Sequence, residues 1–134
     1  VPFFHQLKIA PRFGGPIFSG NAVPEGKGDA NGGWVLLPEP RVVDPLLLAL
    51  YVDAFWPSAL QALSVPAMAP TLDLTIHFRE ELPSGGLSEQ PLLVHNTTAA
   101  MIDGTSDSDS RVYTADGRLL AQARQLQFVA PYEP

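Results

Sequence analysis

The chain has 134 residues, 46% hydrophobic and 16% charged, which suits one compact domain with a buried core. Its net charge of -6 argues against nucleic acid or an anionic membrane as the main partner, because both need a positive field. The absence of cysteine excludes disulfides, thiolate metal sites and a cysteine nucleophile, and it agrees with a cytoplasmic location. No apolar run is long enough to cross a bilayer.

Two strands and a long loop are expected first. β-branched and aromatic residues predict a strand over residues 3 to 10, which Pro11 should end. The stretch from residue 14 to 33, rich in glycine and proline, is typical of a loop. "GGWVLLP", residues 32 to 38, predicts a second short strand. Because the chain opens at Val1 directly into strand-like sequence, we expect it to be part of a longer polypeptide or a processed one.

One long helix is expected from Asp44 to about Trp56. Asp44 suits the N-cap position, and Pro45 suits the first helical position. Pro57 limits the helix, with a further turn through "SALQAL" possible after a kink. The segment is apolar over most of its circumference, so we expect it to be buried on several sides.

Four strands in succession are expected after the helix. From residue 71 to 79 apolar and polar residues alternate, which predicts a half-buried strand. Strands are also expected at 91–102, around "SRVYTA" and over 119–128, with an Asp- and Ser-rich link after the first and a hairpin turn at Asp116-Gly117 before the last. The order predicts an α+β fold in which a curved antiparallel sheet packs on one helix, and the small side chains of Ala121 and Ala123 would let the helix come close.

The sequence predicts no metal site and no bound cofactor. "GKGDANGG" lacks the third glycine of a dinucleotide fingerprint, and the aspartates of "DGTSDSDS" lack the spacing of a calcium loop. The three histidines lie on separate predicted strands, where each is more typical of a partly buried strand residue than of a ligand: His5, His77 and His95.

Asp53 interrupts an apolar stripe of the predicted helix that includes Leu46 and Leu50. If this stripe packs on the sheet, the carboxylate needs hydrogen-bond donors, because an ionised carboxylate buried alone costs several kcal/mol. The alternative is an aspartate on a solvent-facing side of the helix. Thr71 and Gln125 are candidate donors, since both lie on strands where alternation lets them face the helix.

Three stretches carry a resemblance to a known family: "YVDAFWPSAL", "APTLDLTIHFRE" and "DGRLLAQARQLQF". In their order and spacing they resemble the C-terminal hotdog domain of the acyl-CoA thioesterase II type, the tandem-hotdog thioesterases. The resemblance implies one hotdog domain over residues 1–134, forming the second half of a double hotdog. It also implies a second hotdog unit as partner, which would be an N-terminal half, a separate chain or a second copy. We therefore expect an oligomer.

The resemblance also implies a function in lipid metabolism and a catalytic triad. Matched by motif, the triad falls on Asp53, Thr71 and Gln125. These residues would activate a water that hydrolyses a fatty acyl-CoA thioester without a covalent intermediate, with Gln125 donating to an oxygen and accepting from the water. Gln127 has no assigned role. Arg79 and Arg124 are candidates for meeting the phosphates of coenzyme A, although exposed arginines are common.

Two alternatives remain open at this point. One is a non-catalytic hotdog half that completes a double-hotdog interface or binds an acyl ligand. The other is a hotdog dehydratase or hydratase. The sequence disfavours it, because those enzymes use a histidine with an acid on or next to the helix and the predicted helix contains no histidine.

Overall fold

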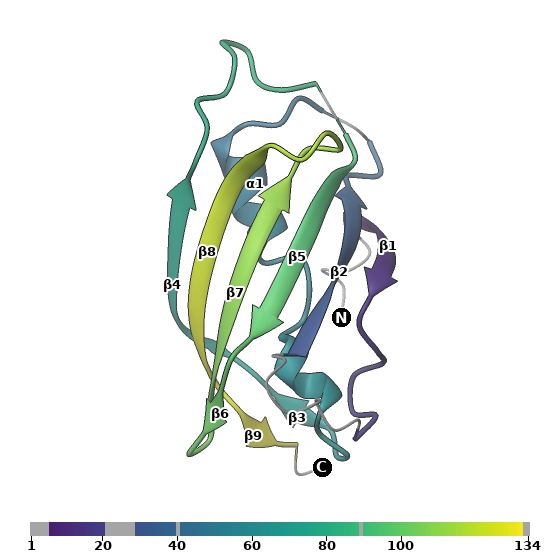
Figure 1. Ribbon diagram of the computed structural model, residues 1–134, viewed down its shortest axis with the longest axis vertical. Helices are drawn as coiled ribbons and strands as arrows, with labels where there is room; N and C mark the ends of the chain where they lie inside the picture. The colour runs from purple at the N-terminus through teal and green to yellow at the C-terminus, as the bar shows by residue number, and fades with distance from the viewer. Residues whose placement is uncertain (1–5, 21–28, 40, 89, 133–134) are drawn as a thin grey trace.

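The computed structural model describes residues 6–20, 29–39, 41–88 and 90–132. A curved antiparallel sheet forms most of it (Figure 1). From one edge to the other, the strands are β1 (Lys8–Phe13), β2 (Asp29–Leu36), β5 (Leu92–Thr98), β7 (Thr105–Tyr113), β8 (Leu119–Phe128) and β4 (Thr71–Phe78). The short β6 (Met101–Ile102) pairs with β7, and β3 (Ala67–Met68) pairs with β9 (Ala130–Pro131) in a separate small sheet. The predicted α+β fold is confirmed.

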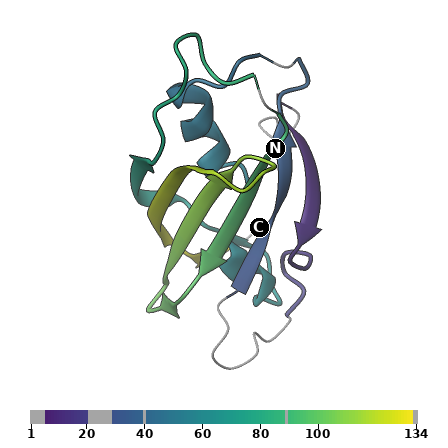
Figure 2. The same ribbon diagram turned by 45° about the horizontal axis from the view of Figure 1, so that its top comes forward.

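Helix α1 (Pro45–Val52) lies in the concavity of the sheet, and the strands curve round it (Figure 2). As predicted, Asp44 is its N-cap: the carboxylate accepts from the backbone N–H of Leu47 at 2.8 Å. The helix is shorter than predicted, because it ends at its C-cap, Asp53, and not at Trp56. The further turn beyond Pro57 is present as the 3-10 helix η2 (Ser58–Gln61).

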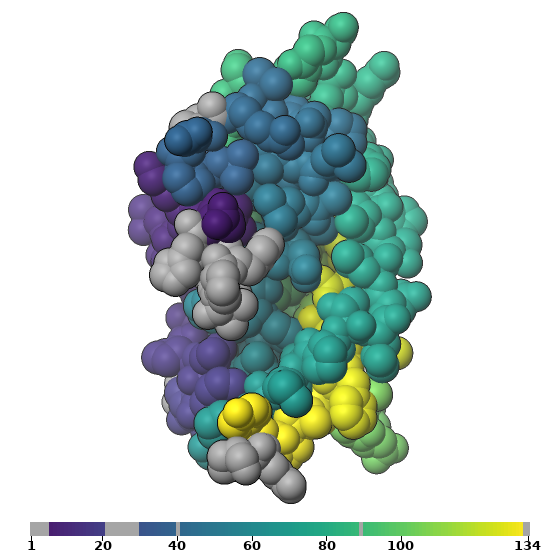
Figure 3. All heavy atoms as spheres, turned by 180° about the vertical axis from the view of Figure 1, so that it is seen from behind, coloured from purple at the N-terminus to yellow at the C-terminus, as the bar shows by residue number. Residues whose placement is uncertain are grey.

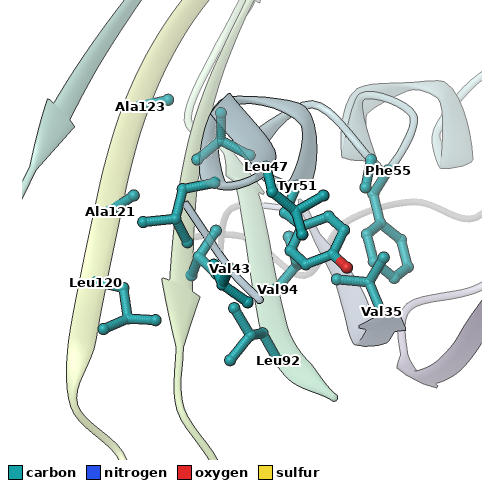
Figure 4. Close-up of a cluster of buried hydrophobic side chains, with 14 of the residues drawn as sticks. Val35, Val43, Leu47, Tyr51, Phe55, Leu92, Val94, Leu120, Ala121 and Ala123 are labelled. Atoms are coloured by element: carbon teal, nitrogen blue, oxygen red, sulfur yellow. The ribbon is translucent and has the colours of Figure 1, made fainter. Parts of the chain in front are cut away.

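The core lies between α1 and the middle strands (Figure 4). Leu47 and Tyr51 point from the helix into it, while Ala121 and Ala123 face them from β8 and are fully buried. These methyl groups leave room for the helix to lie against the strand, as the sequence predicts. The buried face of α1 comprises Leu47, Leu48, Tyr51 and Val52.

The stripe that contains Asp53 is therefore not the one that packs on the sheet. Leu46, at its start, is 78% exposed, and Asp53 is exposed as well. Because the helix is apolar on nearly all sides, periodicity could not identify the buried side, and the packing of Leu47 and Tyr51 against the sheet sets the rotation.

The first two strands differ from their predicted limits. Pro11 lies inside β1 and does not end it, which is possible because β1 is an edge strand and proline there interrupts no ladder on its outer side. Strand β2 starts at Asp29, within the expected loop, and includes Gly32. A Cβ at Gly32 would lie 2.1 Å from the carbonyl oxygen of Val94, so glycine is there for close strand packing.

Strand β7 contains part of the strand expected around "SRVYTA" but begins earlier, at Thr105, within the segment expected to be an Asp- and Ser-rich link. Its residues alternate: Ser106, Ser108 and Ser110 are buried on the concave side, while Asp107 and Asp109 face outward. Serine hydroxyls can be buried when hydrogen-bonded, so a polar segment continues the sheet.

Strand β4 forms the other edge of the sheet and is more exposed than the half-buried strand predicted. Leu72 is 60% exposed and Phe78 is 51% exposed. Seen from the helix side, the yellow C-terminal part of the chain is visible between the blue helical region and the teal β4 region (Figure 3). An apolar edge beside the helix is thus left open in the single unit.

Candidate active site

Asp53 stands at the C-terminal end of α1, where the chain leaves the helix. Its backbone N–H donates to the carbonyl of Leu50 at 3.3 Å, and its φ and ψ of -107° and 13° are no longer helical. The carboxylate is therefore presented from a cap position next to the open side of the sheet. It remains accessible although its hydrogen-bond partner is buried.

That partner is Gln125 of β8, whose side-chain N–H donates to Asp53 Oδ1 at 2.7 Å. The hydroxyl of Thr71, at the start of β4, donates to Gln125 Oε1 at 2.9 Å. The helix end, the edge strand and the last long strand thus bring together the three residues that the sequence singles out. Gln125 lies at their centre and is only 3% exposed.

Two further side chains join this group, and the sequence predicts no role for either. Gln127 Nε2 donates to Gln125 Oε1 at 3.1 Å, and Ser108 Oγ on β7 donates to Gln127 Oε1 at 3.0 Å. Gln127, which has no role in the sequence analysis, is 3% exposed and thus as buried as Gln125. The period of two that faces Gln125 inward also faces Gln127 inward, and this was the available signal.

The hydrogen bonds constrain what each group can offer to a water. The carbonyl oxygen of Gln125 already accepts from both Thr71 and Gln127, which uses its two lone pairs. The predicted acceptance from the water by Gln125 therefore has no place in this arrangement. Thr71 gives its single hydroxyl proton to Gln125, so its oxygen faces other partners as an acceptor, as does the Asp53 carboxylate.

The segment that follows Asp53 is held by two strands, β2 and β5, in the half of the sheet away from β4. The side-chain amides of Asn31 on β2 and Asn96 on β5 donate to the backbone carbonyl of Trp56 at 2.9 and 3.1 Å. Ser110 donates in turn to Asn96 Oδ1 at 3.2 Å. These contacts fix the chain just beyond the helix and thereby limit the movement of the cap.

The other candidates do not join the group. Arg124 lies on the opposite face of β8 from Gln125 and pairs there with Asp109 at 3.0 Å and Asp107 at 3.2 Å. Arg79 is exposed beyond the end of β4, where its backbone N–H donates to Leu120. Within the described residues, no cluster of three histidine or acidic side chains could hold a metal ion; His5 lies outside them.

His95 lies on β5 beside Arg111 and packs against the ring of Phe13, with ring centroids 5.2 Å apart. Burial, and secondarily the positive charge of Arg111, lower the pKa of His95. This histidine therefore stays neutral more readily than a free one.

A curved antiparallel sheet wrapped round one helix defines a hotdog protein, and solved hotdog structures match this chain. More narrowly, the chain belongs to the family of the acyl-CoA thioesterase C-terminal domain, whose model matches residues 2–129. The fold and the family expected from the three sequence stretches are thereby confirmed. No protein with a curated description matches the chain significantly.

Three solved structures illustrate the similarity. A conserved hotdog protein of unknown function from Alicyclobacillus acidocaldarius has a TM-score of 0.77 at 23% identity, over 96% of this chain and 47% of that one. A proposed thioesterase II from Thermobifida fusca has a TM-score of 0.63 at 31% identity, over 82% and 40%. Acyl-CoA thioesterase II TesB2 from Mycobacterium marinum has a TM-score of 0.67 at 17% identity, over 97% and 51%.

The chain thus spans about half the length of these three relatives. Among the described residues, none of the helices has the length and apolar character needed to span a membrane.

Proposed function

We propose that the protein is an acyl-CoA thioesterase that hydrolyses a fatty acyl-CoA to the free acid and coenzyme A. The observation that carries the proposal is the hydrogen-bonded group in which Gln125 joins Asp53 and Thr71, in a chain that belongs to a thioesterase family. Asp53 supplies a carboxylate base, and the two other residues hold fixed positions around it.

In this proposal, Asp53 and the oxygen of Thr71 accept the two protons of one water. A lone pair of that water then points toward the thioester carbonyl, and Asp53 takes a proton as the new C–O bond forms. The C–S bond breaks as the tetrahedral intermediate collapses, and the proton passes to the sulfur of coenzyme A. Gln125 acts by holding Asp53 and Thr71 in this geometry through its amide.

The site is completed by a second hotdog unit. Two observations support this. The chain spans about half of its solved relatives, and β4 is an open edge with exposed apolar side chains, of which Leu74 pairs with the Gln125 that bonds Asp53. Burying the row of Leu72, Leu74 and Phe78 against another unit would remove apolar surface from water and enclose the substrate. In this arrangement residues 1–134 are the second half of a double hotdog.

The test is hydrolysis of acyl-CoAs of several chain lengths by the complete protein, with its second hotdog unit. Asp53→Asn should lower kcat by about 10²- to 10⁴-fold, the usual contribution of a general base. Asp73→Asn is the matched control, since Asp73 lies on the same edge strand but opposite Leu126, on the outer face of β8. Unchanged turnover in Asp53→Asn would refute the mechanism.

A second candidate is a non-catalytic hotdog half that binds an acyl ligand or completes an interface. The observation that favours it is the exposure of both Asp53 and Thr71 in the single unit, which leaves any reacting water open to solvent. Tight acyl-CoA binding by the complete protein, measured by calorimetry and without hydrolysis, would select this candidate.

A further inference from the structure

The hydrogen-bonded group does not end at Gln125 but continues into the sheet. It runs from Asp53 through Gln125 and Gln127 to Ser108, over the end of α1 and strands β8 and β7. The last three side chains are each 3% exposed or less, so solvent does not compete for their hydrogen bonds. Such a buried polar chain is costly unless every member is satisfied.

The direction of every hydrogen bond in this group follows from the Asp53 carboxylate at one end. A carboxylate only accepts, so Gln125 must turn its NH2 toward Asp53 and its carbonyl oxygen toward Thr71 and Gln127. Gln127 must then present its own NH2 to that oxygen, which leaves its carbonyl for the hydroxyl of Ser108. A reversed amide at Gln127 would set two carbonyl oxygens against each other.

The register of the strands makes this contact possible. Ser108 pairs with Gln125 across β7 and β8, and Ser106 pairs with Gln127. Serine is the smallest side chain with a hydroxyl, so the two glutamines can lie over β7 without a clash. Thr71 faces Gln127 from β4 on the other side.

We propose that Gln127, oriented by Ser108, is a positioning residue that fixes the amide of Gln125 for catalysis. This inference rests on the proposed thioesterase function. Gln127 acts through Gln125, since it donates the second hydrogen bond to the side-chain carbonyl of Gln125. With the hydrogen bond from Thr71 alone, this amide could rotate. A displaced Gln125 would carry Asp53 and Thr71 out of position together.

The test uses the complete protein, acyl-CoA hydrolysis and Gln127→Met, which keeps the length of the side chain and removes the donor. We expect kcat to fall about tenfold, as for one ordinary hydrogen bond, with KM unchanged. In a Gln125→Met background the same substitution should lower kcat no further. If Gln127 had only a structural role, Gln127→Met would lower the melting temperature, and its effect on kcat would be the same with and without Gln125→Met.

Matched variants separate the possible outcomes. Gln122→Met changes the opposite face of the same strand and should keep wild-type kcat. Ser108→Ala should lower kcat in the same direction as Gln127→Met, and it keeps the inference testable if Gln127→Met does not fold. Ser106→Ala is its control, because Ser106 is buried on the same face of β7 but donates to the backbone carbonyl of Asp107 and not to the glutamines.

The inference is overturned if folded Gln127→Met or Ser108→Ala keeps wild-type kcat, or if the effects of Gln125→Met and Gln127→Met simply multiply. Asp53→Asn, assayed alongside, distinguishes this from failure of the proposed function. If Asp53→Asn is inactive while Gln127→Met is fully active, the positioning role alone is wrong. If Asp53→Asn is fully active, the proposed function fails and takes the positioning role with it.

Discussion

The side-chain amide of Gln125 donates to the carboxylate of Asp53 at 2.7 Å, across a separation of 72 residues in the sequence. One residue is buried in the last long strand, and the other is the exposed C-cap of the helix. The contact therefore ties the accessible end of the helix to a fixed point in the sheet. It also makes the position of the carboxylate depend on a neutral donor.

Replacing that donor by an acceptor should abolish the arrangement. Gln125→Glu would set two carboxylates against each other, and we expect kcat for acyl-CoA hydrolysis to fall by about 10²-fold or more, as for a misplaced catalytic group. Steady-state kinetics of the complete protein measure the effect. Gln122→Glu makes the same change on the opposite face, next to Arg111, and should leave kcat unaltered. Equal activity of the two variants would contradict a role for Gln125.

The hydroxyl of Thr71 should matter more than its methyl group. Thr71→Val removes the hydrogen bond to Gln125 and the acceptor for the water, so kcat should fall by about tenfold or more. Thr71→Ser retains the hydroxyl and should stay close to wild type. If the valine variant were as active as the serine variant, the hydroxyl would have no part in the reaction.

The N-cap of α1 should be measurable in stability. Asp44→Ala removes the acceptor for the backbone N–H of Leu47 and should lower the free energy of unfolding by about 1 kcal/mol. Asp44→Asn retains a capping oxygen while losing the exposed ion pair with Arg41, and it should cost much less. Urea unfolding of both variants decides between them: equal losses would mean that the ion pair, and not the cap, stabilises this end.

The closeness of helix and sheet predicts intolerance of bulk at Ala121. Ala121→Leu would force extra volume between β8 and α1, and we expect a loss of about 1 to 3 kcal/mol in the free energy of unfolding. Ala115→Leu is the control, because Ala115 lies exposed in the β7–β8 turn. Thermal unfolding followed by tryptophan fluorescence is a suitable measurement, and a neutral Ala121→Leu would show that the helix can move away.

Acid should destabilise the protein through His95. Because burial and the charge of Arg111 lower the pKa of His95 in the folded state, the unfolded chain binds the proton more readily. The free energy of unfolding should therefore fall as the pH drops below the ordinary histidine value of 6.5 toward the lower folded pKa. His95→Gln should show a smaller fall between pH 7.5 and 5.5 in urea titrations.

Local rules in the sequence were sufficient for most of the elements. The N-cap at Asp44, the strand from Thr71 and the Asp116-Gly117 hairpin are set by neighbouring residues, so their signals are short-range. The small side chains of Ala121 and Ala123 likewise predicted that the helix lies close to the sheet. The resemblance of three stretches to a family predicted that Asp53 acts with two distant residues, Thr71 on β4 and Gln125 on β8.

Other features depended on tertiary packing. The polar segment that contains Ser108 carries no apolar alternation, and it becomes part of β7 because the flanking strands supply its backbone and side-chain partners. The place of Gln127 in the hydrogen-bonded group also depends on tertiary packing, because its partner Ser108 is 19 residues away in the sequence.

The sequence by itself determined that one apolar helix carries Asp53 and that a strand with small side chains leads to Gln125. It could not determine how the helix is rotated, because an apolar surface on nearly every side gives no preferred face. Only the packing of Leu47 and Tyr51 into the sheet turned Leu46 and Asp53 outward. That rotation leaves the carboxylate at the open edge, where a hydrogen bond from the buried Gln125 holds it.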